Sequence, residues 1–499
     1  HLTFDILKNI FTFFLSVGLI CQLYAQSTTI TPEVMVPPRL SYNAILAIPA
    51  PVEGSMAFDT TNKVVRVYKG NKWLALAYSQ ETFLPGILAW KATGEETRGL
   101  FESAKDIAVD PEGNVYITGT FSGSILFGNT TTASTGGYDI FIAKYNSTGT
   151  CLWVQKAGGA GADEGRDIAV DTRGNVYVTG QFTGPATFGG LNLTSSNEDI
   201  FIAKYNSLGK VQWVQKAGGP KQDAGNGIFV DFAGYVYVAG FFTDTAVFGS
   251  KTLTSAGNTD MFVAKYTDAG VLDWIRQAGG TDSDRAHAVA VDGAGSIYVA
   301  GEFYGKSVFD GTSLYASFGL SDTFIVKYNY EGTLQWLQKA GLPLSGSECN
   351  LTTDLTGNVW LTSGSGSIFI AKYSRSGVSL WLQEAKGVGG NDFSSTGVAA
   401  DAAGNVYVTG KFSGTTTFNT ATLTSAGSSD IFVAKYNVGG DFQWVQQAGG
   451  AGSDGGEGIV ADAKGNIYAI GNFYGPASFG ATKLTSAGLY DIFIMKIVE

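Results

Sequence analysis

Short runs of alternating apolar and polar residues fill most of this chain, and they return in the same order at a fixed interval. The unit is complete in residues 167–219, which read DIAVDTRGNVYVTGQFTGPATFGGLNLTSSNEDIFIAKYNSLGKVQWVQKAGG. Alternation of this kind is typical of strands, and each unit contains four such runs with almost no helical periodicity. The Asp that ends the first run recurs every 60 to 62 residues, apart from one step of 47, at Asp110, Asp171, Asp231, Asp292, Asp354, Asp401 and Asp462.

Four short strands per unit at this period predict the blades of an all-β, seven-bladed β-propeller over residues 86–499. Residues 87–92 match the fourth strand of a unit, whereas Asp491–Val498 matches a third strand. Two unpaired strands would leave two open sheet edges. We therefore predict that the N-terminal strand of the propeller pairs with the last strand, with Trp90 near Phe493, and closes the ring.

The chain ahead of the propeller divides into two pieces. Residues 1–25 contain Lys8 and the apolar run IFTFFLSVGLICQLYA, which predicts a signal peptide and no membrane span once it is removed. Residues 26–85 contain two alternating runs around a turn at residues 59–62, which predicts a small β-hairpin module and a linker. We expect a secreted protein, extracellular or at the cell surface, with the periplasm as the alternative.

Composition and charge restrict the partners. The 499 residues include 68 Gly, only 15% charged residues and a formal net charge of −11. An acidic surface attracts neither nucleic acid nor an anionic membrane, so we exclude both as partners. Beyond the predicted signal peptide only Cys151 and Cys349 remain, in different repeats, and we expect both to be unpaired.

The blade motif resembles a known family. It reads G-x-x-I-A-V-D-x-x-G-N-x-Y-V-T-G, then F-x-G-x-x-x-F-G, then D-I-F-I-A-K-Y-N and W-V-Q-K-A-G-G. This pattern is similar to the SBBP-type repeat of secreted bacterial seven-bladed β-propellers. The resemblance implies a fold and a repeat, with no common catalytic residue. The stretch around Pro38, Glu53 and Trp73 resembles a short module found ahead of repeat regions in secreted bacterial proteins, which implies a surface or assembly role.

Two sets of carboxylates are expected on the loop-bearing face of the propeller. Calcium is one interpretation, because several oxygens from glycine-rich loops can surround a hard cation. The other is that the carboxylates accept hydrogen bonds from loop N–H groups beside Gly-Gly pairs, and it leaves the protein without a cofactor. The first set lies eight residues before the Asp that closes the first strand, at Glu102, Asp163, Asp223, Asp284 and Asp454; the second opens the third strand, at Asp139, Asp199, Asp260, Asp322, Asp430 and Asp491.

The fifth repeat breaks the pattern. Only five residues separate Gly364 from Phe369, where the second repeat has a long loop, and Trp360 replaces the usual Tyr. Because loops on a rigid scaffold carry function, we predict a ligand-binding notch lined by Trp360, Asp392 and Phe393. The alternative is a neutral deletion with Trp360 packed in the core.

A binding, adhesion or scaffold role is the function that these features favour. After removal of the signal peptide His287 is the only histidine, so zinc held by His and Cys is excluded by count, and no G-x-S-x-G motif is present. The alternative is a carbohydrate-active enzyme, a polysaccharide lyase or glycosidase, that uses two of the many carboxylates. Extracellular carbohydrate or protein is the expected partner.

Overall fold

The computed structural model divides the chain into two compact parts, residues 1–84 and residues 85–499. The predicted signal peptide lies outside the residues that the structure describes. These are residues 39–48, 51, 55–59, 64–69, 72–75, 86–92, 101–317, 321–344, 349–364, 366–387 and 393–498.

The N-terminal part contains the predicted hairpin. Strands β2 (Met56–Asp59), β3 (Val64–Lys69) and β4 (Lys72–Ala75) pair antiparallel in sequence order, and β1 (Arg39–Leu40) pairs parallel to β2. A single helical turn, α2 (Tyr42–Leu46), follows β1. The strand patterns did not predict this helix, whose first turn is capped by the Ser41 hydroxyl accepting from the N–H of Ala44 at 3.3 Å.

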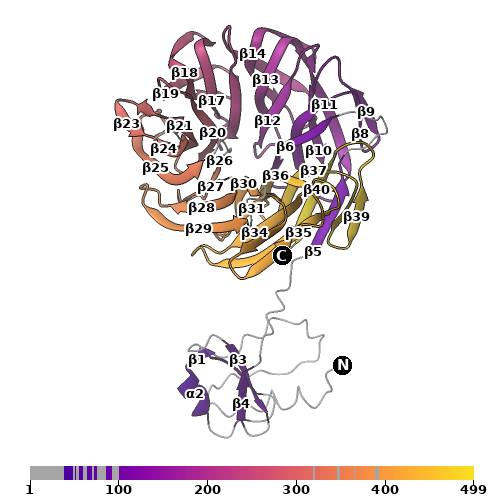
Figure 1. The fold of residues 1–499 in the computed structure, drawn as a ribbon, viewed down its shortest axis with the longest axis vertical. Coiled ribbons are helices and arrows are strands. Elements are labelled where there is room, and N and C mark those ends of the chain that lie inside the picture. Colours follow the sequence, from indigo (N-terminus) through magenta and orange to yellow (C-terminus); the bar gives the residue numbers. More distant parts are fainter. Residues whose placement is uncertain are drawn as a thin grey trace, which may run out of the picture. The chain divides into compact units, whose positions relative to one another are not determined.

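The second part is all-β and is built from four-stranded antiparallel units that stand around a common centre (Figure 1). Each unit is named here after its first strand, which is the innermost. The units are β6 (Glu102–Val109), β7 (Val115–Phe121), β10 (Asp139–Tyr145) and β11 (Cys151–Gly159); β12 (Glu164–Val170), β13 (Val176–Phe188), β14 (Leu191–Tyr205) and β15 (Val211–Gly218); β16 (Ala224–Val230), β17 (Val236–Phe248), β18 (Lys251–Tyr266) and β19 (Leu272–Gly280); β20 (Asp284–Val291), β21 (Ile297–Tyr304), β24 (Ser321–Tyr328) and β25 (Leu334–Leu344); β26 (Cys349–Thr353), β27 (Val359–Ser363), β28 (Ser367–Tyr373) and β29 (Ser379–Gly387); β30 (Phe393–Ala400), β31 (Val406–Phe412), β34 (Asp430–Tyr436) and β35 (Phe442–Gly450); β36 (Gly455–Ala461), β37 (Ile467–Phe473), β40 (Asp491–Val498) and β5 (Gly86–Lys91).

The segments between second and third strands, which the sequence suggested were loops, are largely β-hairpins. They extend β13 with β14 and β17 with β18, or form separate strands, and most pair with the outer strand of the preceding unit. The fifth unit lacks this hairpin, because β27 ends at Ser363 and β28 begins at Ser367. The separate hairpins are β8 (Ser124–Phe127) with β9 (Thr130–Ala133), β22 (Lys306–Phe309) with β23 (Thr312–Tyr315), β32 (Thr415–Phe418) with β33 (Ala421–Thr424), and β38 (Pro476–Phe479) with β39 (Thr482–Thr485).

The Gly-Gly pair at the end of the outer strand is what permits this pairing. A β-carbon on Gly159 would lie 1.9 Å from the carbonyl oxygen of Pro185, and one on Gly219 would lie 1.8 Å from that of Thr245. No side chain fits at those distances, so only glycine allows the backbones to approach so closely.

Neighbouring units also pack through their sheet faces. In each hydrophobic cluster, residues of one unit interdigitate with those of the next; Tyr177 of the β12 unit, for example, packs with Ile228 and Phe262 of the β16 unit. The sheets are apolar on both faces because each lies between two others, which matches the sequence pattern. Burial of an aromatic ring in such a layer contributes roughly 2–3 kcal/mol.

In most units a tryptophan of the outer strand reaches the next unit at the end away from the hairpins. The Trp153 indole donates to the carbonyl of Ser207 at 3.1 Å, and its ring lies against Gly209, where a β-carbon would be 2.9 Å away. The same contact repeats for Trp213, Trp274, Trp336 and Trp381, which donate to the carbonyls of Asp268, Tyr330, Arg375 and Val438.

The two ends of the second part lie side by side, as predicted. Strand β5 pairs antiparallel with β40, and Trp90 is opposite Ile494. The Trp90 ring lies against Gly149 of the β6 unit, where the other tryptophans contact their own neighbours. Hydrophobic residues of β37 and β40 pack with those of β6, β7 and β10 in one cluster. The contact between the last unit and the first is therefore of the same kind as the contacts elsewhere.

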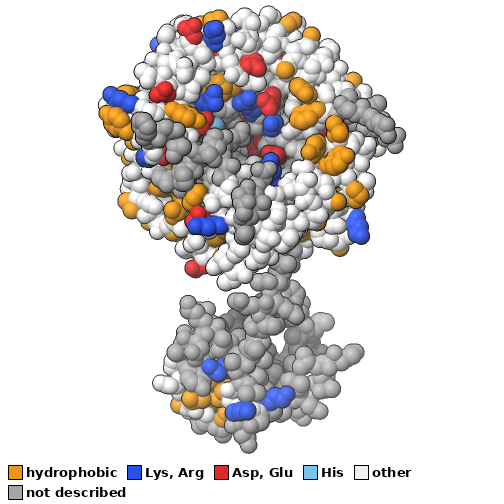
Figure 2. Space-filling view, in the orientation of Figure 1, with side chains coloured by type: hydrophobic (Ala, Val, Ile, Leu, Met, Phe, Trp, Pro, Cys, Tyr) orange, Lys and Arg blue, Asp and Glu red, His pale blue; other side chains and the backbone are white. Residues whose placement is uncertain are grey.

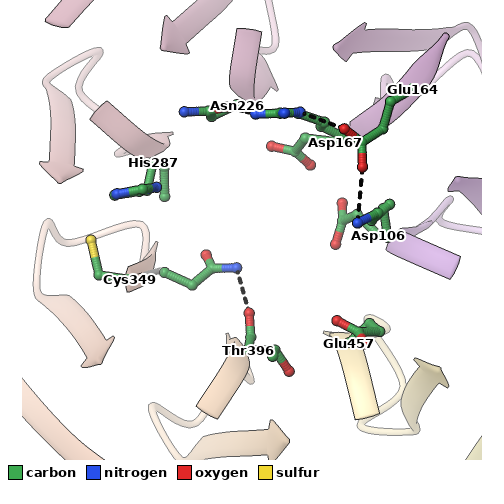
Figure 3. A pocket seen from close by; sticks show the side chains of 12 residues that line it. Asp106, Glu164, Asp167, Asn226, His287, Cys349, Thr396 and Glu457 are labelled. Atoms are coloured by element: carbon green, nitrogen blue, oxygen red, sulfur yellow. Dashed lines mark hydrogen bonds and ion pairs between the residues drawn. The ribbon is translucent and has the colours of Figure 1, made fainter. Parts of the chain in front are cut away.

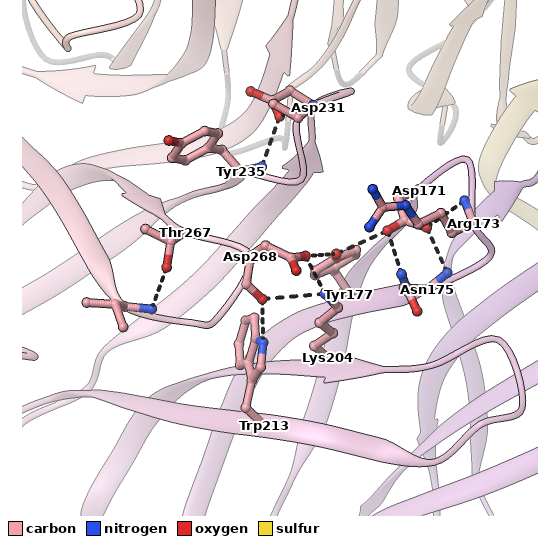
Figure 4. A network of polar contacts seen from close by, with 12 residues as sticks. Asp171, Arg173, Asn175, Tyr177, Lys204, Trp213, Asp231, Tyr235, Thr267 and Asp268 are labelled. Carbon is pink, nitrogen blue, oxygen red and sulfur yellow. Dashed lines mark hydrogen bonds and ion pairs between the residues drawn. The ribbon is translucent and has the colours of Figure 1, made fainter.

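The Asp that closes each first strand is structural. Asp171 Oδ1 accepts from the N–H groups of Arg173 and Asn175, both at 2.9 Å, and Gly174 in the turn has φ +76° (Figure 4). The Tyr177 hydroxyl bridges Asp171 and Asp268 of the next unit, and Lys204 forms an ion pair with Asp268. Asp110, Asp354, Asp401 and Asp462 accept the equivalent backbone bonds in their own turns.

In the part of the chain that the structure describes, no helix has the length and apolar character needed to cross a membrane.

Substituting these tryptophans should separate ring packing from hydrogen bonding. The Trp90 indole N–H is buried and has no hydrogen-bond partner, whereas that of Trp153 donates to Ser207. We expect Trp153→Phe to lower the free energy of unfolding by about 1 kcal/mol more than Trp90→Phe, because only Trp153→Phe loses a hydrogen bond. Both alanine variants should cost about 3–5 kcal/mol. Urea denaturation of the four variants measures this, and a harmless Trp90→Ala would contradict the packing of β5 in the last unit.

Candidate binding site

The centre of the second part is a cavity of about 150 Å³ lined by the innermost strands (Figure 3). Six of those strands contain a β-bulge at the same point, and the extra residue of each bulge lines the cavity. Strand β26 pairs without a bulge, and Cys349 takes the equivalent place. The residues at this position, called here the ring positions, are Lys105, Arg166, Asn226, His287, Cys349, Thr396 and Glu457.

A chain of charged and polar contacts joins four neighbouring units on one side of the cavity. Glu164 accepts from Lys105 at 2.9 Å and from Arg166 Nε at 3.1 Å. Arg166 Nη1 donates to Asn226 Oδ1 at 2.6 Å, and Asn226 Nδ2 donates to the carbonyl of Ala286 at 2.8 Å. These bonds hold Glu164, Arg166 and Asn226 in fixed orientations around the opening.

On the opposite side the ring positions are less tightly bonded. The Thr396 hydroxyl donates to the carbonyl of Gly456 at 2.7 Å. His287 Nε2 is buried, lies 3.7 Å from Glu302 Oε1 and makes no hydrogen bond, and Glu302 Oε2 has no hydrogen-bond partner among the described residues. Buried polar atoms are almost always hydrogen-bonded, so these two atoms are exceptions beside the cavity.

Two carboxyl groups form the floor of this polar region. Asp106 and Asp167 are hydrogen-bonded to each other, and Asp167 also accepts from the N–H of Ile228 at 2.7 Å. Burial raises the pKa of Asp106 well above its ordinary value, and the charge of Asp167 raises it further. Burial also raises the pKa of Asp167. Burial and mutual proximity therefore make both carboxyl groups harder to ionise than exposed ones.

Beyond the carboxyl pair lie two further sections of the cavity, of which the second is mostly apolar. Asp106, Asp167 and Asn350 also line the next section, of about 250 Å³, together with Ile228 and Phe229. A third section of about 330 Å³ is lined by the apolar ends of the inner strands and by Phe232. Figure 2 shows the polar end of the cavity, where charged side chains surround the central hollow. A ligand would meet charged and amide groups at one end and aliphatic side chains at the other.

Sequence reasoning missed the ring positions, although a signal was present. In the repeat motif they fall within the two unassigned residues of G-x-x-I-A-V-D, and the residue type differs in all seven repeats. His287 and Cys349 lie inside the inner strands β20 and β26, and both line the cavity. Neither Cys151 nor Cys349 forms a disulfide, as predicted.

The predicted notch is not supported at Trp360. This residue is 0% exposed and packs in a hydrophobic cluster with Ile368 and Val406, with the Lys372 ammonium 4.7 Å from its ring centre. Trp360 is thus a core residue, as in the alternative interpretation, because the aromatic face of this unit is covered by its neighbour. Asp392 and the side chain of Phe393 lie outside the described residues.

The carboxylates considered for calcium are buried and bonded to the backbone. Asp163 Oδ2 accepts from the N–H of Gly159 at 2.7 Å, and its Oδ1 accepts from the N–H of Thr183 at 3.0 Å. Asp223, Asp284 and Asp454 accept the same bond from Gly219, Gly280 and Gly450. Among the described residues, no group of three or more His, Cys, Asp or Glu side chains is placed to hold a metal ion.

Each of these carboxyls faces one of the second set. Asp430 Oδ1 and Asp454 Oδ2 both lie 2.9 Å from the point that a β-carbon of residue 449 would occupy, which explains the glycine there. Asp430 Oδ1 is buried without a hydrogen-bond partner, as are the equivalent atoms of Asp139, Asp199 and Asp260. Burial raises the pKa of Asp163, Asp284 and Asp454 to about 6 and that of Asp223 to about 7, and the second carboxylate of each pair adds to the rise.

The class of protein follows from this arrangement. Four-stranded antiparallel units that surround a central cavity and pack face to face are the architecture of a β-propeller repeat protein. The SBBP family, described as a β-propeller repeat, matches residues 103–125, 152–181 and 273–302. The protein therefore contains SBBP-type β-propeller repeats.

The chain is also similar to parts of larger curated proteins. It is 28% identical over 228 residues to the uncharacterised WD repeat-containing protein L264 of Acanthamoeba polyphaga mimivirus, covering 38% of this chain and 16% of that protein. It is 24% identical over 216 residues to the regulatory protein FlaEY of Caulobacter vibrioides, covering 41% of this chain and 22% of that protein. The matches thus span less than a quarter of either relative.

Among solved structures, the WD40 domain of Pan2 from Neurospora crassa matches 67% of this chain and 89% of its own, with 11% identity and a TM-score of 0.34.

The pairs formed by aspartates of the first and second sets make the stability of the fold depend on pH. A carboxyl whose pKa is higher in the folded state stabilises the fold when protonated, and that contribution is lost as the pH rises through the folded-state pKa. The pKa values of about 6 to 7 therefore predict that the free energy of unfolding falls between pH 5 and pH 8, by on the order of 1–2 kcal/mol for each pair, and that the melting temperature falls with it. Thermal melts at constant ionic strength measure this.

The substitution Asp430→Asn tests whether the second carboxylate of a pair causes this loss of stability at high pH. Asp430 Oδ2 accepts from the N–H of Ala426 and from Gln447, so the amide oxygen of Asn can keep those bonds, while its NH₂ group replaces the unpartnered oxygen and donates to Asp454. We expect this variant to be more stable than the wild type at pH 8 but not at pH 5, and the exposed control Glu112→Gln to be unchanged. Equal destabilisation at both pH values would contradict the role of the second carboxylate in raising the pKa of Asp454. A calcium-dependent rise in melting temperature that Asp430→Asn abolishes would favour calcium instead.

Proposed function

We propose that the second part of this protein is a closed, seven-bladed propeller and that it acts as a non-catalytic binding protein, with the polar end of the central cavity as the ligand site. The pairing of β5 with β40 and the contact of Trp90 with Gly149 support the closed ring. The ring positions support the binding role. We further propose that the protein is secreted, extracellular or at the cell surface, because of the composition of residues 1–25.

One observation carries the proposal. Most units share their turns, their tryptophans and their carboxyl pairs, but the ring positions hold seven different residue types. Repeats retain what the scaffold needs, so a position that differs in every repeat is not required for packing. Placed together around one opening, the different side chains form an asymmetric set of donors and acceptors, which is what recognition of one ligand requires.

The carboxyl pair favours binding over hydrolysis. A glycosidase needs its two carboxyl groups about 5 Å or more apart, with the sugar between them. Asp106 and Asp167 are hydrogen-bonded to each other and leave no such space. The alternative, a polysaccharide lyase or glycosidase, would have to use other carboxylates, and those of the paired sets are buried beside backbone N–H groups.

Retention on an array of carbohydrates and extracellular matrix proteins tests the proposal. His287→Gln should weaken retention at least about tenfold, because it removes the imidazole from the polar end, while thermal stability changes little since His287 Nε2 makes no hydrogen bond. The control Leu208→Ala alters an exposed turn outside the cavity and should bind like the wild type. Release of reducing ends or unsaturated products would contradict the non-catalytic assignment, and equal retention by His287→Gln would contradict the cavity as the site.

A further inference from the structure

Two neighbouring units carry aromatic rings where the others carry small or polar residues. Before the Asp that opens the third strand, the β6 and β36 units have Tyr138 and Tyr490, whereas the equivalents elsewhere are Glu198, Thr259, Ser321 and Ser429. Before the first strand the β6 unit has Phe101, whereas the described equivalents are Ala162, Gln222, Ser283 and Ser453. After the second strand the β36 unit has Tyr474, and only Tyr304 of the β20 unit is similar.

These residues form two exposed ring pairs. Phe101 and Tyr138 meet edge to face with ring centres 5.2 Å apart, and Tyr474 and Tyr490 lie 5.8 Å apart. Phe101 is 39% exposed, Tyr138 43% and Tyr474 44%. The rings are therefore held by each other and by the strand ends, and they still present surface to solvent.

Both pairs lie on one face of the protein, at the polar end of the cavity. The N–H of Ala104 in β6 donates to Asn472 of β37 at 2.9 Å, which places the two strands side by side. Phe101 precedes Ala104 by three residues and Tyr474 follows Asn472 by two, toward the same end of the antiparallel strands. At about 3.3 Å per residue both lie roughly 7–10 Å beyond that bond. Figure 2 shows hydrophobic side chains gathered on this face beside the central hollow, over β10, β37 and β40.

We infer that the two ring pairs, called here the aromatic rim, bind a neutral polysaccharide across the β6 and β36 units. Aromatic faces are electron-rich and attract the weakly positive C–H groups of a sugar ring, while tyrosine hydroxyls can bond its hydroxyls. The net charge of −11 disfavours acidic glycans. The inference rests on the proposed binding role and names its ligand class.

The size of the aromatic rim argues against a protein partner. Taking roughly 200 Å² for a fully exposed aromatic side chain, Phe101, Tyr138 and Tyr474 expose on the order of 250 Å². A stable protein interface buries about 800 Å² on each partner, with an apolar centre. Two separate ring pairs are instead suited to an extended chain that places one sugar ring on each pair.

Affinity electrophoresis in gels containing laminarin, xylan, mannan or alginate tests the aromatic rim. We expect at least one of the neutral polysaccharides to retard the wild type and alginate not to do so. The double variant Tyr138→Ala/Tyr474→Ala should bind about tenfold more weakly, because each substitution removes one stacking surface. Tyr138→Phe/Tyr474→Phe keeps the rings and should retain most of the affinity. The control Tyr315→Ala removes a 63% exposed ring from β23, outside the aromatic rim and the cavity, and should bind like the wild type.

The outcomes separate this inference from the proposed function. Loss of binding in the alanine double variant, with an unchanged melting temperature, supports the aromatic rim. No retardation by any neutral polysaccharide, or equal retardation of the double variant, overturns it. If His287→Gln abolishes retention on the array while the alanine double variant does not, the cavity is the ligand site and the aromatic rim is not. Stronger retardation by alginate would overturn the neutral ligand class.

Discussion

The contact on which the structure depends is the packing of each four-stranded unit against the next. It has three parts: apolar sheet faces that interdigitate, an outer strand that pairs with the next hairpin, and a tryptophan that lies on the next turn. Each part requires a residue that repeats, namely the alternating aliphatic and aromatic positions, the Gly-Gly pair and the Trp. Because no unit buries both faces alone, the stability of any one unit depends on its neighbours.

This packing leaves the residue type at the ring positions of the inner strands free to vary between units. Where sheets converge toward the centre, side chains no longer meet another sheet but line a narrow opening. The bulge turns one residue of each inner strand toward that opening without disturbing the pairing on either side. The scaffold therefore supplies a site made from several chain segments. The side chains of that site can change without loss of the fold.

Unlike the variable ring positions, the paired carboxyls of the two sets recur from unit to unit. They recur because they hold the loops at the hairpin end, each accepting backbone N–H groups of a Gly-Gly segment. Their proximity and burial raise their pKa values, a cost that the backbone bonds partly offset. Perturbed carboxyls usually suggest a functional site, but here repetition identifies them as part of the scaffold.

The sequence alone determined the repeat and the strand composition, because alternation is a local signal. It also predicted the pairing of residues 87–92 with the last strand, because the repeat leaves one strand at each end without a partner. It did not place Trp360, whose position in the core depends on the neighbouring unit. Nor did it identify His287 and Cys349 as cavity residues or bring Phe101 near Tyr474. Those placements arise where strands distant in the chain converge, and only the tertiary structure decides which side chains meet there.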